Sequence, residues 1–155
     1  MATTITAATL TITHTEKLEI NGVDVGVTNT QTIANVKTFS HRVVPIQTTE
    51  AVVIAMGTVI AAGQFVESDV KYIRLTNLDN TNFITLVFRN EDANEFAQKL
   101  DHGQSFIYNG DLSGGVVDTM DASATALTVS LADLVDITAL ADTAECDLEY
   151  WIGIT

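Results

Sequence analysis

The stretch "KYIRLTNLDNTNFITLVFRN", residues 71–90, decides the fold class because it holds two strand patterns around one polar turn. Residues 72–78 alternate between apolar and polar side chains, and residues 83–89 are again rich in β-branched and aromatic side chains. Residues 79–82 are Asp, Asn, Thr and Asn, which favour turns. Alternation with a period of two residues is typical of a β-strand. The segment therefore predicts a strand, a turn and a second strand.

The same period recurs along the whole chain of 155 residues. The chain contains 23 threonines, many valines and isoleucines, and one proline. β-Branched side chains lose rotamer freedom in helices and pack well on pleated sheets. Roughly nine to eleven short strands, separated by turn residues, have the spacing of a sandwich, a jelly roll or a barrel. We therefore predict an all-β fold, an antiparallel sandwich or jelly-roll-like fold.

Two short motifs predict particular places in this fold. Asn21 and Gly22 separate two alternating runs in "KLEINGVDVGV", and Asn-Gly is a strong hairpin signal because a type I′ turn needs positive φ at both central residues. Pro45 lies within a strand pattern, "RVVPIQT". Because proline has no N–H to donate to a neighbouring strand, Pro45 predicts a sheet edge or a bulge.

The length predicts one domain over residues 1–155, because a chain of this size buries roughly 70% of its unfolded surface in a single core. Residues 1–8 are expected to form a flexible arm. Residues 109–127 are rich in Gly, Ser, Asp and Ala and are expected to form a long loop, and loops of that length tend to be functional or mobile.

Charge and hydropathy narrow the range of partners. The chain has 20 acidic and 7 basic residues, a net charge of -13, and its Lys and Arg residues are scattered singly. We expect no nucleic-acid binding, because phosphate backbones repel such a chain. No apolar run approaches the ~20 residues that span a bilayer, and the first residues lack the positive charge of a signal peptide. We therefore expect no membrane partner and synthesis in the cytoplasm. The single cysteine, Cys146, cannot form an intrachain disulfide.

One motif resembles catalytic machinery. Asp101, His102 and Ser105 lie within five positions in "KLDHGQSF". In a triad, the acid orients the imidazole and the imidazole's other nitrogen meets the nucleophile, and neighbours in a tight turn rarely converge in that way. We interpret residues 101–104 as the turn of a hairpin and predict no catalytic residues and no enzymatic activity.

Metal binding has little support in the sequence. The three histidines, His14, His41 and His102, have no short spacing that would suit zinc. "NLDNTN" (residues 77–82) and "NEDANE" (residues 90–95) offer oxygen ligands but lack the order of a calcium loop. We predict polar turns, no metal and no cofactor, with a structural calcium as the alternative.

Three side chains are candidate interface residues. Strand parity places Trp151 opposite the apolar face of the last strand, among acidic neighbours, and an exposed indole is a common interface anchor. Phe83 and Val87 share one face of their strand, while the other face is also apolar. A strand that is apolar on both faces is covered on both, by its own fold or by another subunit. For Trp151 the alternative is an ordinary core position.

The motifs "YIRLTNLD" and "KLDHGQSF", together with "GGVVDTM" and the closing "DLVDITALADTAECDLEYW", resemble small virion structural proteins of tailed bacteriophages, particularly those that infect cyanobacteria. The likeness runs from about residue 15 onward. It implies a non-enzymatic, β-rich virion part, and first a capsid decoration or cement protein. The expected partners are the major capsid protein or other virion proteins, and the chain itself as a homo-oligomer, with a trimer favoured.

Two alternatives stay open at this point. The chain could occupy another virion position, such as a head-tail adaptor, a tail tube or a fibre. It could also be an adhesion module that binds calcium or carbohydrate on the same framework.

Overall fold

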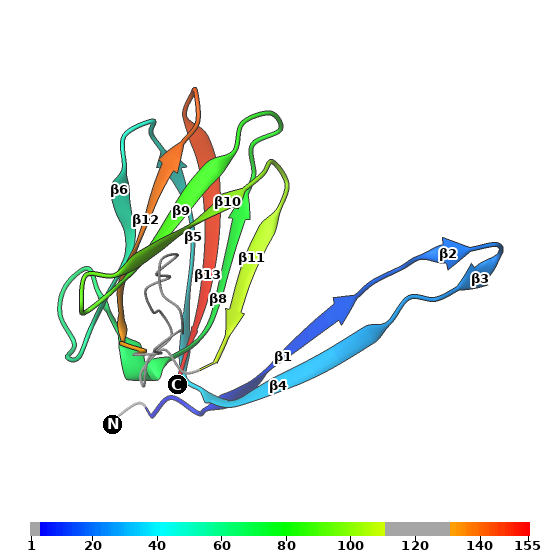
Figure 1. Ribbon diagram of the computed structural model, residues 1–155. Helices are drawn as coiled ribbons and strands as arrows, with labels where there is room; N and C mark the ends of the chain where they lie inside the picture. Colours follow the sequence, from blue (N-terminus) through cyan, green and yellow to red (C-terminus); the bar gives the residue numbers. More distant parts are fainter. Residues whose placement is uncertain (1–3, 111–130) are drawn as a thin grey trace, which may run out of the picture. The chain divides into compact units, whose positions relative to one another are not determined.

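The computed structural model describes residues 4–110 and 131–155, which divide into two compact units (Figure 1). The first unit is Met1–Thr38 with Thr155, and the second is Phe39–Ile154. We call the second unit the body, and each unit is described by itself. The prediction of one domain over residues 1–155 stays a prediction.

The two segments expected to be irregular lie partly outside the described residues. In the expected arm at residues 1–8, residues 4–7 have no regular secondary structure and residue 8 begins a strand. In the expected loop at residues 109–127, Asn109 ends a strand and residues 111–127 fall outside the description.

The body consists of two sheets. One sheet contains β6 (Ala51–Gly57), β7 (Phe65–Val66), β9 (Ile84–Asn90), β10 (Glu95–Leu100) and β12 (Leu134–Ala141), in the order β10-β9-β12-β6-β7. The other contains β5 (Thr38–Ile46), β8 (Val70–Asn77), β11 (Ser105–Asn109) and β13 (Cys146–Ile154), in the order β11-β8-β13-β5. A single 3₁₀ turn, η1 (Glu67–Asp69), precedes β8.

The chain crosses between the two sheets repeatedly. From β5 it passes to β6, then to β8, then to β9 and β10, and afterwards it alternates through β11, β12 and β13. Two facing four-stranded antiparallel sheets joined in this way are a jelly roll, to which β7 adds a short parallel edge. The predicted antiparallel sandwich or jelly roll is therefore confirmed. The described residues hold thirteen strands, more than the nine to eleven expected, because three of them are only two residues long.

Alternation along the strands builds the core of the body. In β9 the buried apolar side chains are Ile84, Leu86 and Phe88, and in β13 Leu148 and Ile152 are fully buried. Burying each such side chain contributes about 1.5–3 kcal/mol. The ring of Phe88 lies 4.7 Å from that of Phe96 in its own sheet and 4.9 Å from that of Phe106 in the other sheet, measured between ring centroids, so the two sheets share one core.

The first unit is a two-stranded ribbon. In it, β1 (Ala8–Thr15) pairs with β4 (Thr28–Val36), and the short strands β2 (Glu19–Ile20) and β3 (Val23–Asp24) continue the pairing toward the turn (Figure 1). Asn21 has φ 51° and Gly22 has φ 80°, so the hairpin predicted from Asn-Gly is confirmed. We call residues 8–36 the ribbon and residues 18–25 its tip.

The prediction for Pro45 is also confirmed, because β5 is an edge strand of its sheet. In the described part of the chain, no helix is long and apolar enough to cross a membrane.

Candidate functional site

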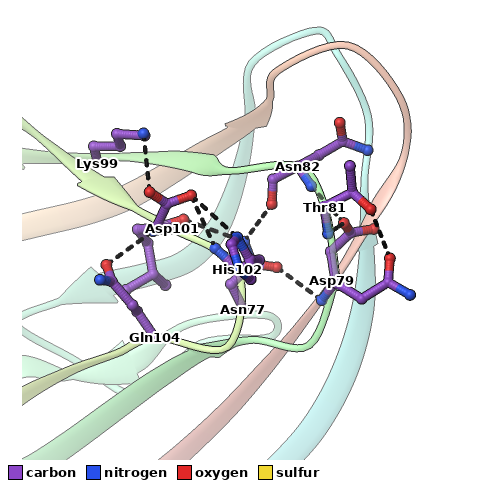
Figure 2. A network of polar contacts seen from close by, with 10 residues as sticks. Asn77, Asp79, Thr81, Asn82, Lys99, Asp101, His102 and Gln104 are labelled. Carbon is purple, nitrogen blue, oxygen red and sulfur yellow. Dashed lines mark hydrogen bonds and ion pairs between the residues drawn. The ribbon is translucent and has the colours of Figure 1, made fainter.

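The turn at residues 101–104 is closed by its own hydrogen bonds (Figure 2). The Asp101 carboxylate accepts from the Lys99 ammonium at 3.1 Å and from the His102 N–H at 3.1 Å. Gln104 donates its N–H to the Asp101 carbonyl, and Gly103 has φ 68°. The hydrogen bond from Lys99, followed by that from His102, lowers the pKa of the Asp101 carboxyl. Each of these contacts stabilises the turn itself.

The three motif residues, Asp101, His102 and Ser105, are not arranged as a catalytic triad. His102 Nδ1 lies 3.5 Å from Asp101 Oδ1, but the Ser105 hydroxyl pairs at 2.8 Å with that of Thr76 on the neighbouring strand. A nucleophilic serine needs the imidazole as its hydrogen-bond partner. The structure thus joins Asp101 to His102 and gives Ser105 a different partner.

The prediction that this turn belongs to a hairpin is wrong. β10 lies in the five-stranded sheet and β11 in the four-stranded sheet, so the turn connects the two layers. The local sequence specifies where the chain reverses, but the partner of each strand is set by the packing of the two sheets.

Asn77 joins this turn to the turn at residues 78–83 (Figure 2). Its fully buried side chain donates from Nδ2 to the Asn82 carbonyl at 2.9 Å and to the Leu100 carbonyl at 3.2 Å, and Oδ1 accepts from the Asp79 N–H at 3.0 Å. Its backbone also bonds to residues 103 and 104. One amide therefore holds two connections between the sheets.

The two segments considered for calcium are closed turns. Asp79 Oδ1 accepts from the N–H groups of Asn82 at 2.6 Å and Thr81 at 2.7 Å, and these bonds lower the pKa of its carboxyl. In the second segment, Asn90 Oδ1 accepts from the Asn94 N–H at 2.8 Å. Within the described ranges, no group of three or more His, Cys, Asp or Glu side chains is placed to hold a metal ion.

Trp151 lies on the outer face of the four-stranded sheet, in an aromatic cluster. Its ring stacks on Phe39 of β5 at 5.7 Å between centroids, with planes 8° apart, and meets the edge of Tyr72 of β8 at 5.5 Å. Phe39 is 63% exposed, whereas Tyr72 is buried. Strand parity predicts the position of Trp151, but Phe39 had no signal in the sequence because the pairing of β5 with β13 is a tertiary feature. The role of Trp151 as an interface anchor stays a prediction.

A row of polar side chains crosses the same face. Glu149 accepts from His41 at 2.8 Å and from Arg74 at 2.7 Å, and Arg74 donates to Thr76 at 2.6 Å. The hydrogen bond from His41, followed by that from Arg74, lowers the pKa of the Glu149 carboxyl. The row therefore links β5, β13 and β8 side by side.

Phe83 and Val87 do not belong to this face. Phe83 immediately precedes β9, and the Lys99 ammonium lies 4.6 Å from its ring centroid. Val87 is half-buried on the outer face of the five-stranded sheet, between Ala97 and Thr138 of the adjacent strands. The structure thus places Trp151 in one sheet, and Phe83 and Val87 in or next to β9 of the other sheet. Their role in an interface stays a prediction.

The ribbon tip is an exposed apolar feature that the sequence did not indicate as a site. Ile20 is paired with Val23, and the Val25 N–H bonds to the Leu18 carbonyl, so these four side chains lie on one face of the tip. They are 51%, 61%, 48% and 54% exposed in the same order. The signal was present in the alternation of "KLEINGVDVGV", but alternation predicts the strand and not whether anything covers it.

A groove lies between the edge strands of the two sheets of the body. It has a volume of about 280 Å³ and is lined on the β5 side by Arg42, Val44, Pro45 and Ile46, and on the β6 side by Ala51, Val52 and Val53. Along β6, pairing with β7 is confined to Met56 and Gly57, so the edge at residues 51–55 has no strand beside it in the described part of the chain.

Comparison with known proteins gives one structural likeness. No protein-family model matches the chain, and no curated protein matches it. A chain of the solved structure described as "Bacillus endospore appendages form a novel family of disulfide-linked pili" shares 12% identity, with a TM-score of 0.42. The match covers 76% of this chain and 87% of that chain. A likeness at this level says nothing about the function or assembly of the present chain, which the fold itself defines as an all-β jelly-roll protein.

Proposed function

We propose that this chain is a non-enzymatic structural subunit of a larger protein assembly. The observation that carries the proposal is the ribbon, which exposes an apolar face at its tip and has outer strand edges with which no other described strand pairs. Features of this kind serve contact with other chains and offer no chemistry.

The ribbon is poorly suited to exist by itself. An isolated two-stranded hairpin is marginally stable in water, and open edges invite pairing with other chains. Among ribbon residues 8–36, Ile12 is the one side chain that is buried, at 8% exposure. Contacts with a partner would cover the tip and supply the missing burial.

The structure of the body suits a rigid component of an assembly. Its core spans both sheets, and its outer faces carry hydrogen-bonded ion pairs such as Arg89 with Glu50, Glu95 and Asp136. The groove of about 280 Å³ and a polar depression of about 250 Å³ beside Asp79 both lie below the ~300–1,000 Å³ typical of small-molecule sites.

We further propose that the assembly is a bacteriophage virion and that the chain is a capsid decoration or cement protein, made in the host cytoplasm. The resemblance of "YIRLTNLD" and "KLDHGQSF" to virion proteins supports this position, and jelly rolls recur among viral capsid domains. The fold alone is only an analogy. The major capsid protein is the proposed partner, and repeated sites on a shell let modest contacts hold by avidity.

Binding to capsids that lack the protein tests the proposal. Purified chain is expected to bind with a saturable number of copies and to raise the temperature at which the capsids open. A matched variant, Val23→Asp, changes an exposed tip side chain and is expected to weaken binding while the circular dichroism of the chain stays the same. Absence of saturable binding would exclude the cement role.

A tail tube or fibre is the second candidate position. A ribbon that docks on a different surface of a neighbouring copy gives head-to-tail contacts, and such contacts form rings or filaments. Electron microscopy of the purified assembly distinguishes the two, because stacked rings or fibres indicate the tail, and single clips on a shell indicate the capsid.

A further inference from the structure

We propose that the ribbon tip of one copy docks in the groove between β5 and β6 of a second copy. This inference rests on the proposed function and names the partner of the ribbon as the chain itself. The contact is head-to-tail, because the tip and the groove are different surfaces of the same protein.

The tip has one apolar face and one acidic face. Leu18, Ile20, Val23 and Val25 form the apolar face, and each is about half exposed or more. On the other face, Glu19 lies directly opposite Asp24. Like charges directly opposite on neighbouring strands are destabilising. A fitting partner therefore offers both an apolar groove and a cation.

The groove offers both of these features. Val44, Ile46 and Val53 line its walls, and Arg42 is a further lining residue. Arg42 is exposed and has no ion-pair partner among residues 4–110 and 131–155. With the apolar face of the tip against the valines, Glu19 and Asp24 are available to Arg42 at the rim.

The edges of the groove favour a tip over an added strand. Pro45 on β5 lacks the N–H that a strand laid along that edge would need. A short hairpin end that inserts side chains between the sheets does not depend on this hydrogen bond. The groove is open to it, because β7 covers only the end of β6 at Met56 and Gly57.

Cysteine pairing tests the contact directly. Val23→Cys and Val52→Cys are purified separately, mixed and oxidised, and a mixed disulfide dimer is expected, whereas Thr30→Cys on the middle of the ribbon gives a much weaker dimer with Val52→Cys. The native Cys146 is buried and stays out of the reaction. Equal yields with Thr30→Cys would contradict tip docking. Closure of a dilute Val23→Cys/Val52→Cys double variant within one chain would contradict a second copy.

Charge reversal gives an independent measurement by sedimentation. Arg42→Glu is expected to raise the dissociation constant of self-association at least tenfold. Adding Glu19→Lys to this variant is expected to restore most of the lost affinity. An unchanged constant for Arg42→Glu would overturn the assignment of Arg42.

The two proposals fail in different ways. Saturable binding to capsids by a chain that shows no self-association and no mixed disulfide overturns the docking proposal and leaves the cement role standing. Mixed dimers formed by a chain that never binds capsids leave tip docking standing and overturn the capsid position.

Discussion

The ribbon and the body are built from the same kind of sequence, yet they have opposite surroundings. Both alternate apolar and polar side chains, and both are rich in threonine, valine and isoleucine. In β9 of the body, Leu86 is fully buried, whereas Val23 in the ribbon is 61% exposed. The difference is the second sheet, which faces β9 and which the ribbon lacks. Alternation therefore identifies a strand, and burial depends on what packs against it.

The largest expected difference between the two regions is in the cost of removing an apolar side chain. Leu86→Ala is expected to lower the free energy of unfolding by about 2–5 kcal/mol, because it leaves a cavity between the sheets. Val23→Ala is expected to change it by less than about 0.5 kcal/mol in the monomer. Urea unfolding of both variants measures the contrast, and similar costs would mean that the tip is buried in the isolated chain.

The next effect concerns the buried side chain of Asn77, which bonds to both turns that connect the sheets of the body. Asn77→Leu removes the donor for the Asn82 and Leu100 carbonyls and the acceptor for the Asp79 N–H. Leaving such groups unsatisfied costs about 1–3 kcal/mol each, so we expect a loss of at least about 2 kcal/mol by thermal unfolding. Thr81→Ala, on the exposed side of the same turn, serves as the control and is expected to cost far less.

A smaller effect is expected at the ribbon turn. Gly22→Ala forces a side chain into φ 80°, although the space beside it is open, so the penalty is one of backbone conformation of about 1 kcal/mol. Because the ribbon is a separate unit, amide exchange in residues 8–36 is expected to quicken while exchange in the body stays unchanged. Faster exchange throughout the body would contradict that separation.

The smallest effect is the pH dependence of the outer face of the body. Hydrogen bonds from His41 and Arg74 lower the pKa of the Glu149 carboxyl in the folded chain. The stability from this pairing is therefore complete above the carboxyl's ordinary pKa and is lost as the pH falls through the lowered value. Glu149→Gln is expected to flatten the acid side of the stability profile by up to about 1 kcal/mol. An unaltered acid slope would show that the pairing adds nothing.

The sequence by itself determined which segments are strands, where several turns fall and which side chains point inward. The period of two fixes the parity of Leu148, Ile152 and Trp151, Asn21-Gly22 fixes the hairpin, and Pro45 marks an edge, because these signals depend on local backbone geometry.

Only the tertiary structure decided which strands are neighbours. It placed β10 and β11 in different sheets and stacked the ring of Phe39 on that of Trp151. It also paired the Ser105 hydroxyl with that of Thr76, and left the apolar side chains of the ribbon tip exposed. These outcomes depend on contacts between segments far apart in the chain, and such contacts are selected by the packing of the two sheets as a whole and not by the residues on either side of a turn.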